Sequence, residues 1–387
     1  MRLLFAVLFS LAALVFVREA RADEPEPPPT VYLYTIGPHS DFPSRLGHAL
    51  LCAREAGHDE PAHGRCFDYG VADSEDMFEV GWTAMRGRPN FVPVVIGESV
   101  MLEFFKERGR AIERQSLPLS GQEAASLVGA MEREVSSGKP FAYHPYWANC
   151  TTKLRDHIDV ATNGKLRPGP STIPPGTLRD YFEEGHSGRI AILTAMAIYF
   201  GEGNDHRPTP WEAMLVPAIL RDGVAERFGV PPEQVAERLE PVLPTSRALG
   251  RIVVFVVAFA LFLTVRFCAR RDRLGLALKI VGGTLGTLAV TVEMTSALVK
   301  WPEISHNWAL LLLWPIDLAL PYLGKRLALY LKIRIAVTVV VAVLEIVSVA
   351  HQPLLQLVAL VVLPFAALLS ALKSAKPVTE TEPAPAV

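Results

Sequence analysis

The segment Ala148-Asn149-Cys150-Thr151-Thr152-Lys153-Leu154-Arg155-Asp156 directly follows an aromatic stretch at 141–147. We expect a helix to begin at the start of this segment, because Leu154 and Ile158 are four residues apart and would share one buried face. Cys150 would then lie at the helix N-terminus, where the helix dipole and unpaired backbone amides stabilise a thiolate. The same amides could hold an oxyanion. The segment therefore indicates a nucleophilic cysteine, with a buried structural cysteine as the alternative that spacing alone leaves open.

Upstream of this segment, strand signals and helix signals are mixed. Residues 31–36 alternate as a strand does, and 47–52 and 66–70 look like two more strands around a turn rich in Gly, His and Pro. A capping box at 120–123 opens a helix whose apolar residues recur every four positions. The pattern predicts an α+β domain without giving the order of its strands.

His48 is the histidine best placed to act as a base for a cysteine nucleophile. It lies in Gly47-His48-Ala49-Leu50, on the second predicted strand, where its ring would be held rigidly. A partly buried structural histidine is the alternative reading. Most other histidines of this half fall in polar loops, and they lack the spacing of metal ligands, so we expect no metal and no cofactor. These are His39, His58, His63, His186 and His206.

The second half of the chain is strongly apolar and predicts a membrane domain. Each apolar span is close to the ~20 residues that a bilayer crossing needs. Clusters of Arg and Lys follow the first, third and fifth spans, whereas the two other loops carry only Lys300 at an edge. The positive-inside rule then places 23–250 outside and the C-terminus inside. The expected spans are 252–267, 274–298, 308–323, 335–350 and 353–372.

Acidic residues inside these spans are candidates for a polar site in the membrane. Glu293, Asp317 and Glu345 would be costly in hydrocarbon and should face the bundle interior or a polar cavity. A role in lining the substrate path and a role in structural pairing or headgroup exposure remain equal alternatives.

The first 22 residues indicate a cleaved secretory signal, with Arg2 before an apolar core at 3–17 and small residues at Ala20 and Ala22. An uncleaved anchor helix is the alternative. Export allows disulfides to persist, and three of the four cysteines fall in the exported half, so they cannot all pair. The formal net charge of −2 over 387 residues gives no reason to expect nucleic acid as a partner.

Several short motifs, taken in order along the chain, resemble those of a known family. They are Gly47-His48-Ala49, Phe67-Asp68-Tyr69-Gly70, Arg114-Gln115 leading into Leu117, Asn149-Cys150-Thr151-Thr152, Thr209-Pro210-Trp211-Glu212-Ala213-Met214 and His306-Asn307-Trp308. With these motifs the chain is similar to Lnb-type lipoprotein N-acyltransferases, which join an exported cysteine domain to a five-helix membrane domain. The cysteine domain is also similar to permuted NlpC-like thiol enzymes, in which the histidine strand precedes the cysteine helix. The resemblance thus implies an α+β permuted papain-like (NlpC-like) domain followed by an all-α membrane domain of five transmembrane helices.

The resemblance also implies roles for particular residues. Cys150 would be the nucleophile and His48 its base, and a third polar residue should come from the strand beside the histidine. Asp68 is the first candidate for that position and Asp73 the second, because the family tolerates other residues where Asp68 stands. Secondary candidates are Tyr69, Asn149 and Thr151, with Glu293, Asn307, Asp317 and Glu345 in the membrane domain.

A hairpin argument links the cysteines to this site. If Cys52 and Cys66 face each other across a hairpin, His48 and Asp68 share a face and are diagonal neighbours. Their hairpin spacing and exported location predict a disulfide, which would leave Cys150 as the unpaired thiol.

The expected organisation is a signal peptide at 1–22, an exported catalytic domain at 23–216, a connecting helical segment at 217–249, the transmembrane domain at 250–373 and a cytoplasmic tail at 374–387. The resemblance implies a multi-pass protein of the bacterial inner membrane with its catalytic domain on the periplasmic side. It would move an acyl chain from a phospholipid to the N-terminus of a diacylated lipoprotein. A membrane-bound thiol hydrolase (a phospholipase or amidase) and a non-catalytic lipoprotein-binding protein remain as alternatives.

Overall fold

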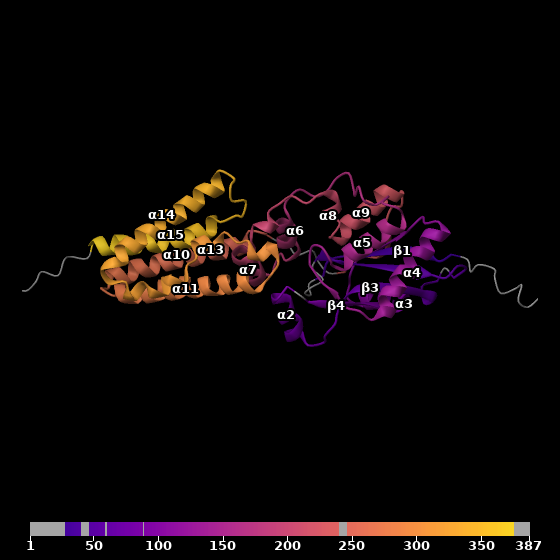
Figure 1. Cartoon of the computed structure of the whole chain (residues 1–387), viewed down its shortest axis with the longest axis horizontal. Coiled ribbons are helices and arrows are strands. Elements are labelled where there is room, and N and C mark those ends of the chain that lie inside the picture. Colours follow the sequence, from indigo (N-terminus) through magenta and orange to yellow (C-terminus); the bar gives the residue numbers. More distant parts are fainter. Residues whose placement is uncertain (1–27, 40–45, 59, 88, 240–245, 375–387) are drawn as a thin grey trace, which may run out of the picture.

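The computed structural model describes residues 28–39, 46–58, 60–87, 89–239 and 246–374. The expected signal peptide and most of the expected cytoplasmic tail lie outside these residues. The described chain forms a sheet domain and a helical bundle that follow one another along the long axis of the molecule (Figure 1).

A seven-stranded antiparallel sheet forms the centre of the sheet domain, in the order β6-β4-β3-β2-β1-β5-β7. The three strands expected from the sequence are its middle strands β1, β2 and β3, and Cys52 pairs directly with Cys66 across β2 and β3. The strands are β1 Thr30–Ile36, β2 His48–Arg54, β3 Gly64–Ala72, β4 Asn90–Gly97, β5 Ile112–Ser116, β6 Phe141–Ala142 and β7 Glu233–Ala236.

Helices cover both faces of this sheet because alternate residues of its strands are buried on opposite sides. Leu51 and Phe67 pack with α4 and α5 on one face, while Tyr34 and Leu50 pack with α3 on the other. The expected capping box at Ser120 is present at the start of α4. The helices are α2 Met77–Met85, α3 Glu98–Glu107, α4 Gly121–Ser137, α5 Cys150–Ala161, α6 Leu178–Gly185, α7 Ile190–Tyr199, α8 Pro210–Ala213 and α9 Pro217–Phe228, with 3-10 turns η2 Pro61–His63 and η3 Glu202–Asn204.

The segment expected as a helical connection contributes to the sheet domain. Ile219, Leu220 and Val224 of α9 are buried in the same cluster as α4 and α5, and β7 pairs with β5 at the edge of the sheet. The domain core therefore extends to about Ala236 along the chain.

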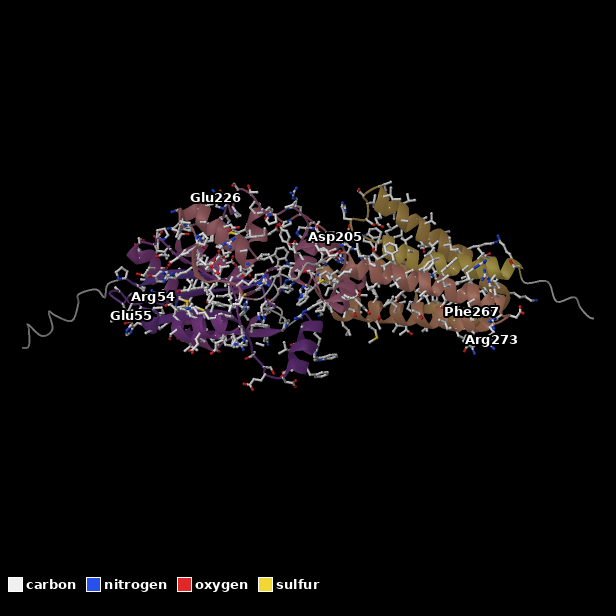
Figure 2. The ribbon with its side chains drawn as sticks, turned by 180° about the vertical axis from the view of Figure 1, so that it is seen from behind. Arg54, Glu55, Asp205, Glu226, Phe267 and Arg273 are labelled. Atoms are coloured by element: carbon white, nitrogen blue, oxygen red, sulfur yellow. A yellow bond between two sulfur atoms is a disulfide. The ribbon has the colours of Figure 1, made fainter. Side chains whose placement is uncertain are left out.

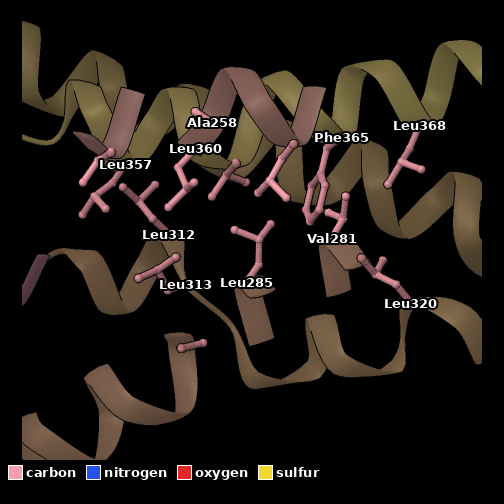
Figure 3. Packing of buried hydrophobic residues seen from close by; sticks show 14 of the residues in the cluster. Ala258, Val281, Leu285, Leu312, Leu313, Leu320, Leu357, Leu360, Phe365 and Leu368 are labelled. Carbon is pink, nitrogen blue, oxygen red and sulfur yellow. The ribbon is translucent and has the colours of Figure 1, made fainter. Parts of the chain in front are cut away.

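Four helices of the bundle are long and apolar enough to cross a membrane, counted over the described residues. Leu285 of α11 faces Leu360 and Phe365 of α15 in a continuous apolar core (Figure 3). The helices are α10 Leu249–Arg270, α11 Leu274–Leu298, α14 Leu327–Ile346 and α15 Leu355–Ser374.

The third expected span, 308–323, is not a continuous helix. It consists of α13 Ala309–Leu312, a two-residue extended break and the 3-10 segment η4 Pro315–Tyr322, and η5 Gly324–Arg326 follows it. Pro315 and Pro321 explain this, since proline has no N–H to donate and its ring obstructs the preceding helical turn. The expected count of five transmembrane helices is therefore not confirmed; in the described part of the chain the bundle has four such helices and one broken segment.

Small residues of α11 let this broken segment pack closely. A Cβ on Gly282 would lie 2.6 Å from the carbonyl oxygen of Asp317, and one on Gly286 would lie 2.6 Å from the backbone nitrogen of Leu318. One side of the irregular backbone is thus packed against α11, and burial in protein is the setting in which such backbone is tolerated at membrane depth.

The bundle contacts the sheet domain through α12 Pro302–Ser305. Trp147 Nε1 donates to Glu303 Oε1 at 3.0 Å, and His144 Nε2 lies 3.6 Å from Glu303 Oε2. Both aromatic residues belong to the loop that leads into α5. A side chain from the membrane half therefore holds the segment just before Cys150.

Candidate active site

The imidazole of His48 lies between a thiol and a carboxylate. Its Nδ1 is 3.2 Å from Cys150 Sγ, and its Nε2 is 3.0 Å from Asp68 Oδ1. His48 is the first residue of β2, so the three side chains meet at the end of the sheet. Gly47 precedes it with φ 96°, a conformation that favours glycine, and a Cβ there would lie 2.7 Å from the carbonyl oxygen of Ile36. The turn at Gly47 therefore fixes the backbone position from which the His48 side chain extends.

The backbone of β3 holds the carboxylate of Asp68 in place. β3 has an irregularity between Asp68 and Val71, and the N–H of Gly70 donates to Asp68 Oδ1 at 2.6 Å. The register places Asp68 diagonally from His48, as the hairpin argument expected. A Cβ on Gly70 would lie only 2.7 Å from His48 Cε1, so this position needs glycine for room.

Cys150 is the first residue of α5, as the sequence predicted. The Asn149 side chain accepts from the backbone N–H of Thr152, and the Thr152 hydroxyl accepts from the N–H of Asn149. This capping box leaves the N–H groups of Cys150 and Thr151 without an acceptor inside the helix. Asn149 Nδ2 also donates to the carbonyl oxygens of Pro145 and Leu215, which anchors the start of the helix.

The electrostatics favour an ion pair between sulfur and imidazole. Burial would raise the pKa of the Cys150 thiol, but the charge and hydrogen bond of His48 outweigh it and hold that pKa below its ordinary value. Burial would lower the pKa of His48, yet the charges of Asp68 and Cys150 raise it well above its usual range. Burial would likewise raise the pKa of Asp68, and the charge of His48 lowers it instead. The arrangement thus favours the thiolate form of Cys150 and the protonated form of the His48 imidazole.

Tyr143, which the sequence did not single out, lies within electrostatic range of Cys150. Burial, and then the charge of Cys150, raises the pKa of its phenol, so the hydroxyl stays protonated. Its ring stacks on Phe91 at 4.2 Å between centroids, and its N–H donates to the carbonyl oxygen of Pro89. The aromatic stretch before Cys150 was visible in the sequence, but nothing in its spacing places one phenol beside the sulfur.

The other candidates of the sheet domain have different surroundings. Tyr69 points away from Asp68, and its hydroxyl lies 3.0 Å from His157 Nε2. Thr151 is buried with its hydroxyl 3.7 Å from Cys150 Sγ. Asp73 is exposed just after β3, and its N–H donates to the carbonyl oxygen of Asn90.

Three of the four membrane-domain candidates are engaged in structural contacts. Asp317 pairs with Arg334 at 2.8 Å, and Glu345 accepts from the N–H of Leu354 just before α15. Asn307 donates to the carbonyl oxygens of Ile198 and Tyr199 and accepts from Gln352, so it ties α7 to the bundle.

Glu293, the fourth, is exposed on α11. Within the described residues, no hydrogen bond or ion pair joins any of the four to Cys150, His48 or Asp68.

The disulfide between Cys52 and Cys66 is present, and Cys150 and Cys268 are free thiols. Across the described ranges, no group of three or more His, Cys, Asp or Glu side chains could hold a metal ion.

Residues 25–183 match the family described as the Lnb N-terminal periplasmic domain. The match contains His48, Asp68 and Cys150. No curated protein and no solved structure matches the chain.

Proposed function

We propose that this chain, whose residues 25–183 form an Lnb N-terminal periplasmic domain, is a lipoprotein N-acyltransferase of the bacterial inner membrane. It would move a fatty acyl chain from a phospholipid to the α-amine of the N-terminal diacylglyceryl-cysteine of a lipoprotein. The observation that carries the proposal is the Cys150–His48–Asp68 contact series inside that domain. The four membrane-capable helices that follow it support lipid substrates.

The first half-reaction would consume the phospholipid. The Cys150 thiolate attacks the ester carbonyl carbon, and the resulting oxyanion accepts hydrogen bonds from the free amides at the start of α5 and from Tyr143. When the carbon–oxygen bond breaks, His48 gives its Nδ1 proton to the leaving alkoxide. The products are a Cys150 thioester and a lysophospholipid, with His48 now neutral.

The second half-reaction would consume the lipoprotein. The α-amine attacks the thioester carbon while neutral His48 takes one of its protons, and the carbon–sulfur bond breaks to give an amide and the Cys150 thiolate. Asp68 holds Nε2 so that Nδ1 faces the sulfur in both steps. The ion pair is restored at the end of the cycle, so no further reactant is needed.

The same site could serve a hydrolase if water replaced the amine. The bundle of several membrane-capable helices favours the transferase, in which both substrates are membrane-bound, because a soluble acceptor would not require such a bundle. The alternation of basic clusters along the bundle supports a periplasmic catalytic domain.

Order of addition tests the proposal. Phospholipid supplied alone to the purified protein in lipid nanodiscs should yield lysophospholipid and an acyl-enzyme that hydroxylamine cleaves. Diacylated lipopeptide added afterwards should collect the chain, as mass spectrometry of the peptide would show. Release of free fatty acid in its place would identify a hydrolase.

The two free cysteines give a matched pair of variants. Cys150→Ala should abolish acyl-enzyme formation and transfer, whereas Cys268→Ala, in the bundle, should leave both unchanged. Transfer that survives in Cys150→Ala would show that the thioester route is wrong.

A further inference from the structure

Helix α2 leaves large apolar side chains exposed. Phe78 is 78% exposed and Trp82, one helical turn later, is 45% exposed. None of the α2 residues whose burial is described is buried. An amphipathic helix normally covers its apolar stripe with another surface. The exposed pair therefore indicates a partner outside the sheet domain.

The position of α2 identifies that partner. Gly87 follows the helix, and a Cβ there would lie 3.2 Å from Trp301 Nε1. Trp301 is the third residue after α11, one of the four membrane-capable helices. Figure 1 shows α2 at the end of the sheet domain nearest the bundle. The C-terminal end of α2 is thus fixed at the level where the bundle would leave the bilayer.

We propose that α2 lies in the outer surface of the same bilayer that holds the bundle, with Phe78 and Trp82 in the boundary between headgroups and acyl chains. Trp is enriched at this depth because its ring is apolar and its N–H is polar. Interfacial helices bury their apolar face by roughly 5–10 Å in this zone. The occupant is lipid, since the bundle brings lipid to this height and the apolar face is otherwise open.

The chain on either side of α2 connects this surface to Cys150. α2 is inserted between β3, which carries Asp68, and β4, whose Phe91 stacks on Tyr143 in the loop that leads to Cys150. A docked α2 would therefore hold the lipid surface next to the thiol. This consequence rests on the proposed function, whereas the docking itself does not.

Depth-dependent quenching tests the docking without any activity measurement. The full chain carrying Cys150→Ala and Cys268→Ala keeps its disulfide and accepts a single labelled cysteine at Phe78→Cys. In nanodiscs whose lipids carry a nitroxide high on the acyl chain, a nitrobenzoxadiazole label there should be quenched several-fold more than at the control Val100→Cys. Val100 is 62% exposed on α3, which lies away from the bundle. Equal quenching at the two positions would overturn the proposal.

A second pair of variants separates docking from chemistry. Phe78→Asp combined with Trp82→Asp should slow acyl-enzyme formation from phospholipid in vesicles about 10-fold or more, with the rate on a water-soluble short-chain ester unchanged. Val100→Asp should change neither rate. If the double variant slows the reactions with phospholipid and with the soluble ester equally, or slows neither, α2 does not bring the lipid surface to Cys150. If the wild-type chain forms no acyl-enzyme, the proposed function fails while the quenching result stands.

Discussion

Individual charges set the pH range in which the proposed nucleophile works. The thiolate–imidazolium pair exists above the lowered pKa of Cys150 and below the raised pKa of His48. Activity should therefore rise with pH through the first pKa and fall with pH through the second. Burial works against the His48 charge, and the carboxylate of Asp68 is the largest influence that offsets it.

Removing the Asp68 carboxylate should lower the alkaline limit of the pH range in which the protein is active. Asp68→Asn takes away the charge that raises the pKa of His48, so the alkaline limb of kcat/KM should move to lower pH. The rate at the optimum should also fall, because the neutral amide oxygen accepts a weaker hydrogen bond from His48 Nε2 and holds the imidazole less firmly. Asp73→Asn, which changes an exposed aspartate near the same strand end, is the matched control. If the alkaline limb moves in the Asp73 variant and stays in place in the Asp68 variant, Asp73 and not Asp68 is the partner of His48.

Gly70 should be sensitive to substitution, although it carries no side chain. A Cβ there would be 2.7 Å from His48 Cε1 and 3.1 Å from Asp68 Oδ1, so Gly70→Ala must displace the imidazole. A displacement of about 1 Å can lower the rate by about 10²-fold. Gly97→Ala, whose Cβ would make an ordinary 3.6 Å contact with Val100, should be close to wild type. Acyl-enzyme formation and thermal unfolding of both variants would check this, and full activity in Gly70→Ala would show that the site tolerates the shift.

Secondary-structure elements differ in how well the sequence predicts them. The starts of α4 and α5 follow from local rules, since Ser120 and Asn149 each form a capping box with a residue three positions later. The hairpin and its disulfide follow from the spacing of Cys52 and Cys66. Local patterns of this kind act within a few residues, so a single sequence carries them.

Other features depend on contacts that the local sequence does not encode. Pro315 and Pro321 account for the break in 308–323, but the close packing of the broken segment on Gly282 and Gly286 of α11 cannot be read from the local sequence. The position of Tyr143 is similar, because only the fold brings its phenol within electrostatic range of Cys150. Gly70 was part of a recognised motif, but its need for room depends on where the His48 ring lies.

The broken segment is held by a buried pair in the bundle. Arg334 of α14 donates to Asp317 and, through Nη2, to the carbonyl oxygen of Leu312 at the break. Both charged side chains are fully buried. The span expected at 335–350 excludes Arg334, whereas α14 includes it. The arginine thus replaces the hydrogen bond that the broken helix cannot make.

Removing one partner of this pair should be costly. Arg334→Met leaves Asp317 as an unpaired buried charge, and the expected loss is about 3–5 kcal/mol of stability. Adding Asp317→Leu should recover part of it, with the rest lost at the carbonyl of Leu312. Thermal unfolding in detergent measures the effect, and Arg326→Met, at an exposed arginine, should show little change. If Arg334→Met is as stable as the control, the pair does not hold the break.

The two halves of the protein are joined at one end of the bundle, and this constrains how the chain crosses the membrane. Glu303 contacts the loop before α5, so α12 lies on the side of the sheet domain. Arg273, at the start of α11, lies at the far end of the bundle (Figure 2). Cationic side chains are favoured on the cytoplasmic side, so the far end should face the cytoplasm and the sheet domain the periplasm.

The number of crossings then determines the side of the C-terminus. Four helices alone would return the chain to the periplasm, because an even number of crossings ends where it began. If the broken segment also crosses, the number is odd and the chain ends in the cytoplasm. Lys325 and Arg326 follow that segment, and Lys373 lies at the end of α15, so the basic residues favour the odd number.

A reporter that is active only in the periplasm should therefore be inactive when it is fused after Ser374, after Lys325 or after Arg273. The same reporter fused after His306 should be active. Activity after Ser374 together with activity after Lys325 would mean that the broken segment enters the bundle and does not cross it.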